Sequence, residues 1–253
     1  MIPYRVTING IQVSAAYSER SVRDIFLPLL AKLSGLQRAK GRRILVMLAA
    51  PPGAGKSTLL SFLEELSRKK ESFLPGVQAI GMDGFHRRQE YLQHHFIERD
   101  GKTIPMVRIK GAPVTFDLAG LKKSLESVSA GDVCGWPVYD RLLHNPVSDA
   151  VTVSGDIILL EGNYLLLDKE GWRDLSAYAD YTISVAADEA FLRKRLIDRR
   201  IRTGVDADEA VRFVDFSDMP NVRLCLQHSK PADLELRLDP GGEYSIRKMV
   251  PEA

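Results

Sequence analysis

A strand-like apolar hexapeptide followed by a glycine-rich turn and an amphipathic helix constrains the fold of this chain more than any other feature. Ile44–Ala49 contains no polar residue and no alternation, which is typical of a parallel strand buried on both faces. Residues 57–69 then place leucines on one side of a helix. This β-turn-α unit predicts an α/β protein with a parallel sheet.

The rest of the chain continues the alternation of strands and helices. Strands are predicted near residues 77–82, 157–160, 181–185 and 234–238, and helices near 117–128 and 188–202. Together they predict a doubly wound sheet with helices on both faces. The segments 86–113 and 131–151 are less periodic and rich in polar, Gly and Pro residues, so they are predicted to be loops at the site.

The N-terminal residues have a different pattern. Residues 4–15 alternate around Asn9-Gly10, which predicts a β-hairpin with a tight turn. A helix is expected from about Ser21, where Asp24 follows at the spacing of a capping signal. We therefore expect a hairpin-helix extension over residues 1–41 and the main α/β domain over residues 42–253.

Composition excludes several classes of protein. The 253 residues are 45% hydrophobic and 27% charged, which excludes a disordered or fibrous chain. Lys and Arg exceed Asp and Glu by only 2 charges, too few for a general nucleic-acid or membrane binder. Cys134 and Cys225 lack disulfide or zinc spacing. We expect a cytoplasmic protein, neither exported nor embedded in a membrane, and leave open whether it forms a homodimer.

The glycine-rich turn carries a phosphate-binding signature. Residues 50–58 fit the P-loop, with Ala50 in the place of its first Gly. The turn and the following helix end direct backbone N–H groups at phosphate oxygens. Lys56 is predicted to reach the β- and γ-phosphates, Ser57 to bind Mg²⁺, and Thr58 to reach the α-phosphate. The predicted ATP-binding residues are Gly53, Ala54, Gly55, Lys56, Ser57 and Thr58.

An acid follows the second predicted strand. Asp83 lies 27 residues after Lys56 and precedes Gly84. At the carboxyl end of a strand it could face the γ-phosphate and accept the proton of an attacking hydroxyl. The alternative is that Asp-Gly only caps a turn.

Six segments in order resemble the uridine kinase, phosphoribulokinase and bacterial pantothenate kinase branch of P-loop kinases. The closest similarity is to bacterial proteins described only as nucleoside- or nucleotide-kinase-like, or as candidate fructose transport system kinases. The resemblance implies a P-loop NTPase fold with a five-stranded parallel core in the order 2-3-1-4-5 and extra strands from the termini, and the use of ATP and Mg²⁺. The segments are residues 50–58, 82–86, 110–117, 137–141, 159–164 and 195–200.

The resemblance assigns roles to individual residues. It implies that Asp83 is the base and that Glu161 lies near the metal, although Glu161 could instead be a buried acid paired with Lys56. It also implies a lid over about residues 190–206, in which Arg195 and Arg199 act on the transferring phosphoryl group. The alternative for this helix is a solvated basic face.

Two loop regions are candidates for the acceptor pocket. The segment between residues 87 and 110 carries a surplus of three positive charges, which suits an anionic or polyhydroxylated acceptor but equally a solvated loop. Residues 139–144 match a stretch that lies against the nucleoside in uridine kinases, and the alternative is a surface loop packed on the core. The predicted substrate residues are Asp83, His86, Arg87, Lys110, Tyr139, Arg141 and His144.

These observations predict an ATP-dependent kinase that phosphorylates a hydroxyl of a small molecule such as a nucleoside, a sugar or a pantothenate-like alcohol. No nucleic-acid or membrane partner is expected. The alternatives are a regulatory P-loop ATPase without an acceptor and a nucleic-acid-binding ATPase that uses the basic helix.

Overall fold

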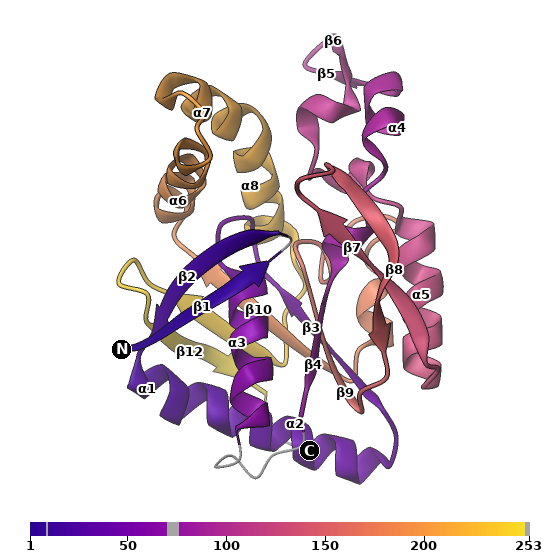
Figure 1. Ribbon diagram of the computed structural model, residues 1–253, viewed down its shortest axis with the longest axis vertical. Coiled ribbons are helices and arrows are strands. Elements are labelled where there is room, and N and C mark those ends of the chain that lie inside the picture. The colour runs from indigo at the N-terminus through magenta and orange to yellow at the C-terminus, as the bar shows by residue number, and fades with distance from the viewer. Residues whose placement is uncertain (9, 70–75, 251–253) are drawn as a thin grey trace.

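The computed structural model describes residues 1–8, 10–69 and 76–250, and its centre is a six-stranded sheet (Figure 1). The order is β4-β9-β3-β10-β11-β12, with β12 antiparallel to β11 and the other pairs parallel. Numbered along the chain, the five parallel strands lie in the order 2-3-1-4-5, as predicted. The strands are β3 (Ile44–Ala49), β4 (Gln78–Gly81), β9 (Ile157–Gly162), β10 (Tyr181–Ala187), β11 (Leu234–Leu238) and β12 (Tyr244–Met249).

The central strand β3 separates two hydrophobic cores. All six of its residues are buried. Ile44, Val46 and Leu48 belong to one core, whereas Leu45, Met47 and Ala49 belong to the other. The lack of polar alternation in the sequence follows from this double burial.

Helices cover both faces of the sheet, which confirms the predicted fold class (Figure 1). The first core takes residues from α2 (Leu27–Lys40), α3 (Lys56–Arg68) and α6 (Glu189–Arg202), and from the start of α8 (Met219–His228). The second core takes residues from α5 (Leu118–Ala130). Between α6 and α8 lie α7 (Ala207–Phe213) and a π-helical turn, η7 (Val214–Asp218).

The predicted N-terminal hairpin is present as β1 (Ile2–Ile8) and β2 (Ile11–Tyr17), which pair with each other and form a sheet of their own. Asn9 of the predicted turn lies outside the described residues. Of the termini, β12 extends the central sheet and the hairpin does not. The hairpin packs on α3, which places Tyr4 and Tyr17 in the first core. The domain boundary between residues 41 and 42 stays a prediction.

The predicted helix start at Ser21 is wrong by a few residues. The helical segment begins with α1 (Glu19–Ser21), and the side chain of Ser18 accepts a hydrogen bond from the Ser21 N–H at 2.9 Å. A π-helical turn, η1 (Val22–Phe26), follows and leads into α2. The capping serine is therefore Ser18, three residues before the predicted Ser21.

The two segments predicted as loops contain regular structure, so that prediction is wrong. Residues 131–151 contribute to a hairpin of β7 (Cys134–Asp140) and β8 (Asn145–Val153), in which a register shift between Trp136 and Val138 disrupts the alternation. Residues 86–113 contain α4 (Gln89–His94), β5 (Phe96–Arg99), β6 (Lys102–Pro105) and the 3₁₀ turn η4 (Met106–Ile109). Within the described ranges, no helix is long and apolar enough to cross a membrane.

Candidate active site

The P-loop has the backbone geometry that its glycines predict. Gly53 and Gly55 both have φ of 86°, and Gly55 is the N-cap of α3. A Cβ atom at Gly53 would lie 3.1 Å from Cγ of Leu196, because α6 packs directly on this turn. Both glycines are needed for the left-handed backbone, and Gly53 also for the close approach of α6.

Lys56, Ser57 and Glu161 form a cluster at the carboxyl ends of β3 and β9. Glu161 pairs in register with Leu48, which brings its carboxylate to the start of α3. Ser57 Oγ donates to Glu161 Oε1 at 2.5 Å, and Lys56 Nζ lies 3.7 Å from Glu161 Oε2. The pairing of Lys56 with a buried acid, one of the two interpretations from the sequence, is therefore present.

The environment of Glu161 is unusual for an acid. Its side chain is only 6% exposed, and Oε2 accepts no hydrogen bond in the described part of the chain. Burial raises the pKa of Glu161, Lys56 opposes the shift, and the charge of Asp83 adds to it. A buried oxygen without a hydrogen bond, next to a serine hydroxyl, has the oxygen chemistry that Mg²⁺ prefers.

Asp83 lies just after β4, within the 3₁₀ turn η3 (Met82–Phe85). Its carboxylate takes part in none of the hydrogen bonds found among residues 1–8, 10–69 and 76–250, and the N-cap of η3 is Gly81. Burial acts to raise the pKa of Asp83, but the charges of His86, Lys56 and other basic groups hold it below its ordinary value. The carboxylate is therefore ionised at neutral pH and free to accept a proton, which the turn-cap interpretation does not explain.

Residues of β7 hold the segment around Asp83, and the sequence did not single them out for this purpose. Trp136 is fully buried, and its Nε1–H donates to the Gly81 carbonyl at 2.8 Å. A Cβ atom at Gly84 would lie 1.9 Å from the Pro137 carbonyl oxygen. The sequence signal for this contact was Gly84 of the Asp-Gly dipeptide, because a residue without a side chain allows β7 to approach closely as well as the chain to turn.

His86, Lys110 and Tyr139 come together beside Asp83. His86 Nδ1–H donates to the Asp83 carbonyl at 2.8 Å, and its ring lies 5.1 Å from that of Tyr139. Burial lowers the pKa of His86, although Asp83 opposes this shift. Lys110 Nζ donates to the His144 carbonyl at 2.9 Å and lies 4.9 Å from the Tyr139 ring centre, and burial lowers its pKa to about 8.

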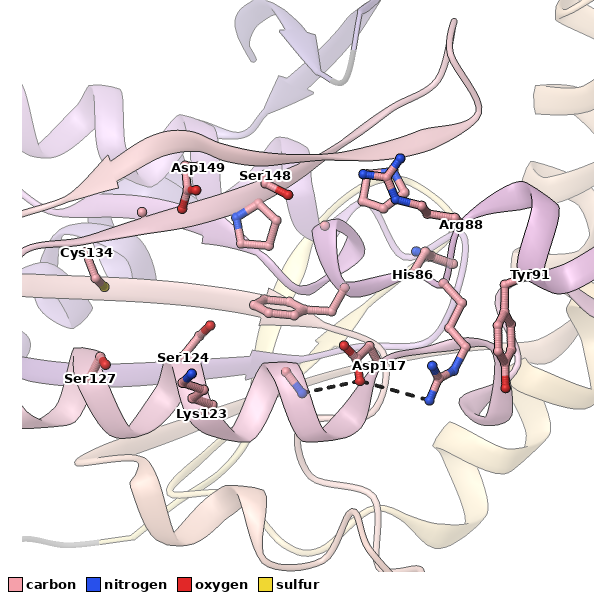
Figure 2. A pocket seen from close by; sticks show the side chains of 17 residues that line it. His86, Arg88, Tyr91, Asp117, Lys123, Ser124, Ser127, Cys134, Ser148 and Asp149 are labelled. Carbon is pink, nitrogen blue, oxygen red and sulfur yellow. Dashed lines mark hydrogen bonds and ion pairs between the residues drawn. The ribbon is translucent and has the colours of Figure 1, made fainter.

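Arg87 does not join this group. Its guanidinium lies 4.6 Å from the ring centre of Tyr91 and 4.0 Å from the carboxylate of Asp117. All three residues line a cavity of about 720 Å³ between α5 and the β7–β8 hairpin. Figure 2 shows Tyr91 and Asp117 in its wall. Neither the P-loop nor Asp83 lines that cavity. His144 contributes its backbone carbonyl, and Arg141 lies within electrostatic reach of both Asp83 and Glu161.

The basic residues of α6 divide into two groups. Arg195 Nη2 lies 3.3 Å from the position of a Cβ atom on Gly55, and Arg199 is within electrostatic reach of Asp83 and Arg141. Of the two predicted lid arginines, Arg195 therefore lies at the P-loop and Arg199 lies on the side of Asp83. Arg193 instead forms two hydrogen bonds to Asp215, at 2.7 and 2.8 Å, on an exposed surface.

A second, smaller cavity adjoins Asp83 and the Ser57–Glu161 pair. It has a volume of about 280 Å³, and Ser57, Asp83, Tyr139 and Glu161 all line it. Among the described residues, no group of three or more His, Cys, Asp or Glu side chains could hold a metal ion. The residues suited to Mg²⁺ are thus Ser57 and Glu161, with phosphate oxygens as the expected further ligands.

Comparison with known proteins places the chain among kinases. No protein-family model matches it. An uncharacterized protein of Escherichia coli, YggC, is 40% identical over 94% of this chain and 97% of its own length. A candidate uridine kinase of Schizosaccharomyces pombe, C227.14, is 29% identical over 78% of this chain and 83% of its own length.

A solved structure has the same fold over most of its length. The crystal structure of a candidate fructose transport system kinase from Silicibacter sp. TM1040 superposes with a TM-score of 0.69 and 30% identity. The match covers 80% of this chain and 98% of that one. Pantothenate kinases, such as that of Shewanella piezotolerans at 27% identity, are more distant relatives. The chain belongs to the P-loop kinase family that includes the uridine kinases and the bacterial pantothenate kinases.

Proposed function

We propose that this protein is an ATP- and Mg²⁺-dependent kinase that transfers the γ-phosphoryl group to a hydroxyl of a small molecule. The observation that carries the proposal is the state of Asp83. Its carboxylate makes no hydrogen bond among the described residues and lines a cavity together with Ser57 of the P-loop, and nearby basic groups hold its pKa below the ordinary value. A free carboxylate at that position suits a general base.

The proposed reaction is an in-line displacement. The acceptor oxygen forms a bond to the γ-phosphorus as the bond from this phosphorus to the β–γ bridging oxygen breaks, and ADP leaves. Asp83 accepts the proton of the attacking hydroxyl. Lys56 and the N–H groups of the P-loop bind the phosphates, and Thr58 binds from the same turn.

Ser57 and Glu161 are the residues that would hold Mg²⁺. The buried Oε2 of Glu161 accepts no hydrogen bond in the described chain, and Ser57 Oγ lies 2.5 Å from its other oxygen. When bound, the ion neutralises charge on the β- and γ-phosphates. Glu161 binds either directly or through water.

We assign Arg195 and Arg199 to the lid. Arg195 lies over Gly55 of the P-loop, and Arg199 is in the electrostatic environment of Asp83. Both can stabilise charge on the transferring phosphoryl group. Of the predicted substrate residues His86, Lys110, Tyr139 and Arg141, only Tyr139 lines the smaller cavity beside Asp83, and the other three lie outside its described lining. The nucleic-acid alternative loses support, because Arg193 and Arg200 of the same helix are engaged by Asp215 and Asp218.

We also propose a cytoplasmic location, since both cysteines are free thiols. ADP release with and without candidate nucleosides, sugars and pantothenate tests the kinase assignment. Release that depends on one acceptor supports it. Slow release that no acceptor changes would favour a regulatory ATPase, and steeply salt-dependent binding of RNA or DNA would favour the nucleic-acid alternative.

A further inference from the structure

The cavity of about 280 Å³ extends from the catalytic cluster to the N-terminal hairpin. Asp83 and Glu161 line its catalytic end, Ser61 and Glu64 of α3 line one side, and Ile8 at the end of β1 lines another. Pockets for small ligands begin at about 300 Å³. The volume of this cavity lies close to that lower limit, so the cavity suits only a small molecule, of about the size of a sugar or a nucleoside.

The lining carries negative charge only. Three carboxylates face the cavity, and no Lys or Arg is among the described residues that line it. Arg68 and Lys56, the ion-pair partners of Glu64 and Glu161, lie outside the lining. Arg141 reaches the catalytic end electrostatically and suits the phosphates there. A carboxylate or phosphate on the acceptor would lose its hydration next to like charges, which is a strong basis for rejection.

The same cavity offers hydrogen-bonding groups to an uncharged polar molecule. Three residues that carry hydroxyl groups, Thr7, Ser61 and Tyr139, line the cavity. Apolar side chains such as Ile8 and Val138 complete the walls, a mixture typical of pockets for small alcohols.

The hairpin is fixed to the kinase core, so it can act as a permanent wall. The hydroxyl groups of Tyr4 and Ser61 are hydrogen-bonded at 2.8 Å, and Tyr17 stacks on Phe62 with ring centres 4.3 Å apart. At its tip, a Cβ atom on Gly10 would lie 3.8 Å from Leu142 of the β7–β8 turn. The hairpin therefore reaches from α3 to the turn between β7 and β8.

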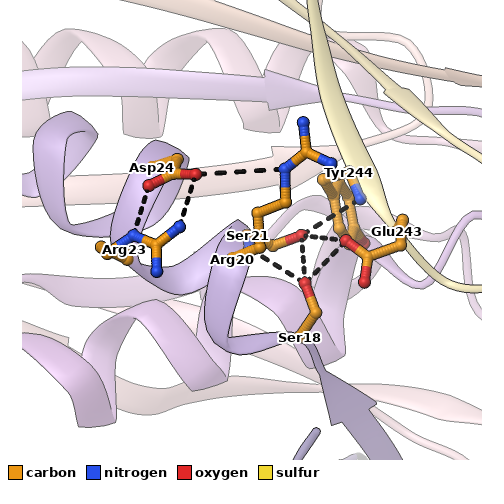
Figure 3. Close-up of polar contacts among 7 residues, drawn as sticks. All are labelled: Ser18, Arg20, Ser21, Arg23, Asp24, Glu243 and Tyr244. Carbon is orange, nitrogen blue, oxygen red and sulfur yellow. Dashed lines mark hydrogen bonds and ion pairs between the residues drawn. The ribbon is translucent and has the colours of Figure 1, made fainter.

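A second anchor holds the end of the hairpin to the last strand of the sheet. Figure 3 shows Glu243, next to β12, at the helix that follows β2. Its Oε2 accepts hydrogen bonds from Ser18 Oγ at 2.6 Å and Ser21 Oγ at 3.2 Å. The backbone N–H of Tyr244 donates to Ser21 Oγ at 3.2 Å.

We infer that the acceptor is an uncharged hydroxylated molecule of sugar or nucleoside size that binds in this cavity, with Ile8 of the N-terminal hairpin as a specificity-determining wall. The inference rests on the proposed kinase function. The reacting hydroxyl lies at Asp83, and the remainder of the molecule extends between α3 and the hairpin. Acceptors that carry a carboxylate or a phosphate are rejected.

Matched pairs of acceptors test the charge rule. We would measure kcat/KM with uridine and uridine 5′-monophosphate, fructose and fructose 6-phosphate, and pantothenol and pantothenate. The expected result is turnover of a neutral member at least about tenfold above its anionic partner. Faster turnover of an anionic member would overturn the inference and leave the kinase function standing. A lack of acceptor-dependent ADP with every pair would overturn both.

Two variants of the same strand test the wall. Ile8→Trp fills the cavity, so we expect the KM of the active acceptor to rise at least about tenfold while the KM of ATP stays unchanged. Arg5→Trp is the control, because Arg5 is exposed and does not line the cavity. An unchanged acceptor KM in Ile8→Trp, or equal changes in both variants, would remove the hairpin from the acceptor site.

Discussion

Replacing Gly84 with Ala tests how the fold positions the proposed base. The added Cβ would lie 1.9 Å from the carbonyl oxygen and 2.3 Å from the carbonyl carbon of Pro137. Contacts of this kind need about 3 Å or more, so η3 and β7 must separate by roughly 1 Å. Both partners are backbone, and no side-chain rotation can relieve the overlap.

The expected magnitude follows from this displacement. Overpacking costs about 1–3 kcal/mol of stability, and Trp136 loses alignment with the Gly81 carbonyl that it binds at 2.8 Å. A shift of about 1 Å at a reacting group costs roughly 10²-fold in rate. We therefore expect Gly84→Ala to lower kcat by about 10²-fold, with a small change in the affinity for ATP.

The assay combines steady-state kinetics with a thermal melt of the unliganded protein. Gly35→Ala is the control, since Gly35 lies in α2, and a Cβ there meets no atom within 4 Å. This control should keep full activity and gain about 0.5–1 kcal/mol. Wild-type kcat and melting temperature in Gly84→Ala would refute the claim that the approach of β7 positions Asp83.

Three further substitutions test individual groups. Asp83→Asn should keep ATP affinity and lower turnover by about 10²–10⁴-fold; an active variant that merely melts early would restore the turn-cap interpretation. Arg199→Ala should lower single-turnover rates by about 10³-fold. The control is Lys194→Ala, because the Lys194 side chain is exposed, whereas Arg193 is bound to Asp215. Equal losses in the two variants would remove the lid role. Lys56→Ala should abolish transfer, with unchanged turnover arguing against the P-loop mechanism. It should also destabilise the fold at neutral pH by up to about 3 kcal/mol. Because the folded state raises the pKa of Glu161, this loss should shrink as pH falls through that raised pKa and be absent below about 4.3, where the acid is protonated in both states.

The parts of the fold that could be predicted depend on contacts close in sequence. The burial of β3, the turn at Gly53 and Gly55, and the start of α3 follow from local pattern. The strand order came from the resemblance to known kinases. The β7–β8 hairpin could not be predicted, because its register shift and Pro137 break the alternation that marks a strand.

The candidate site shows the same division between local and distant contacts. Lys56 and Ser57 follow directly from the P-loop pattern, whereas the surroundings of Asp83 depend on Trp136, more than 50 residues away along the chain. Arg87 was predicted to bind substrate because it belongs to the basic segment between residues 87 and 110. The Arg87 guanidinium lies near Tyr91 and Asp117 in the larger cavity, and Arg87 is not among the residues that line the smaller cavity beside Asp83.

Access to the substrate, and not basicity alone, distinguishes the roles proposed for the two acids, Asp83 and Glu161. Glu161 has the higher pKa of the pair relative to its ordinary value, so basicity would favour it as the proton acceptor. However, its side chain is 6% exposed, and Oε1 is occupied by the Ser57 hydroxyl. Asp83 is partly exposed and makes no hydrogen bond in the described chain. A base must first reach the proton that it removes, which supports the proposal that Asp83 accepts the proton and that Glu161 serves the cation and Lys56.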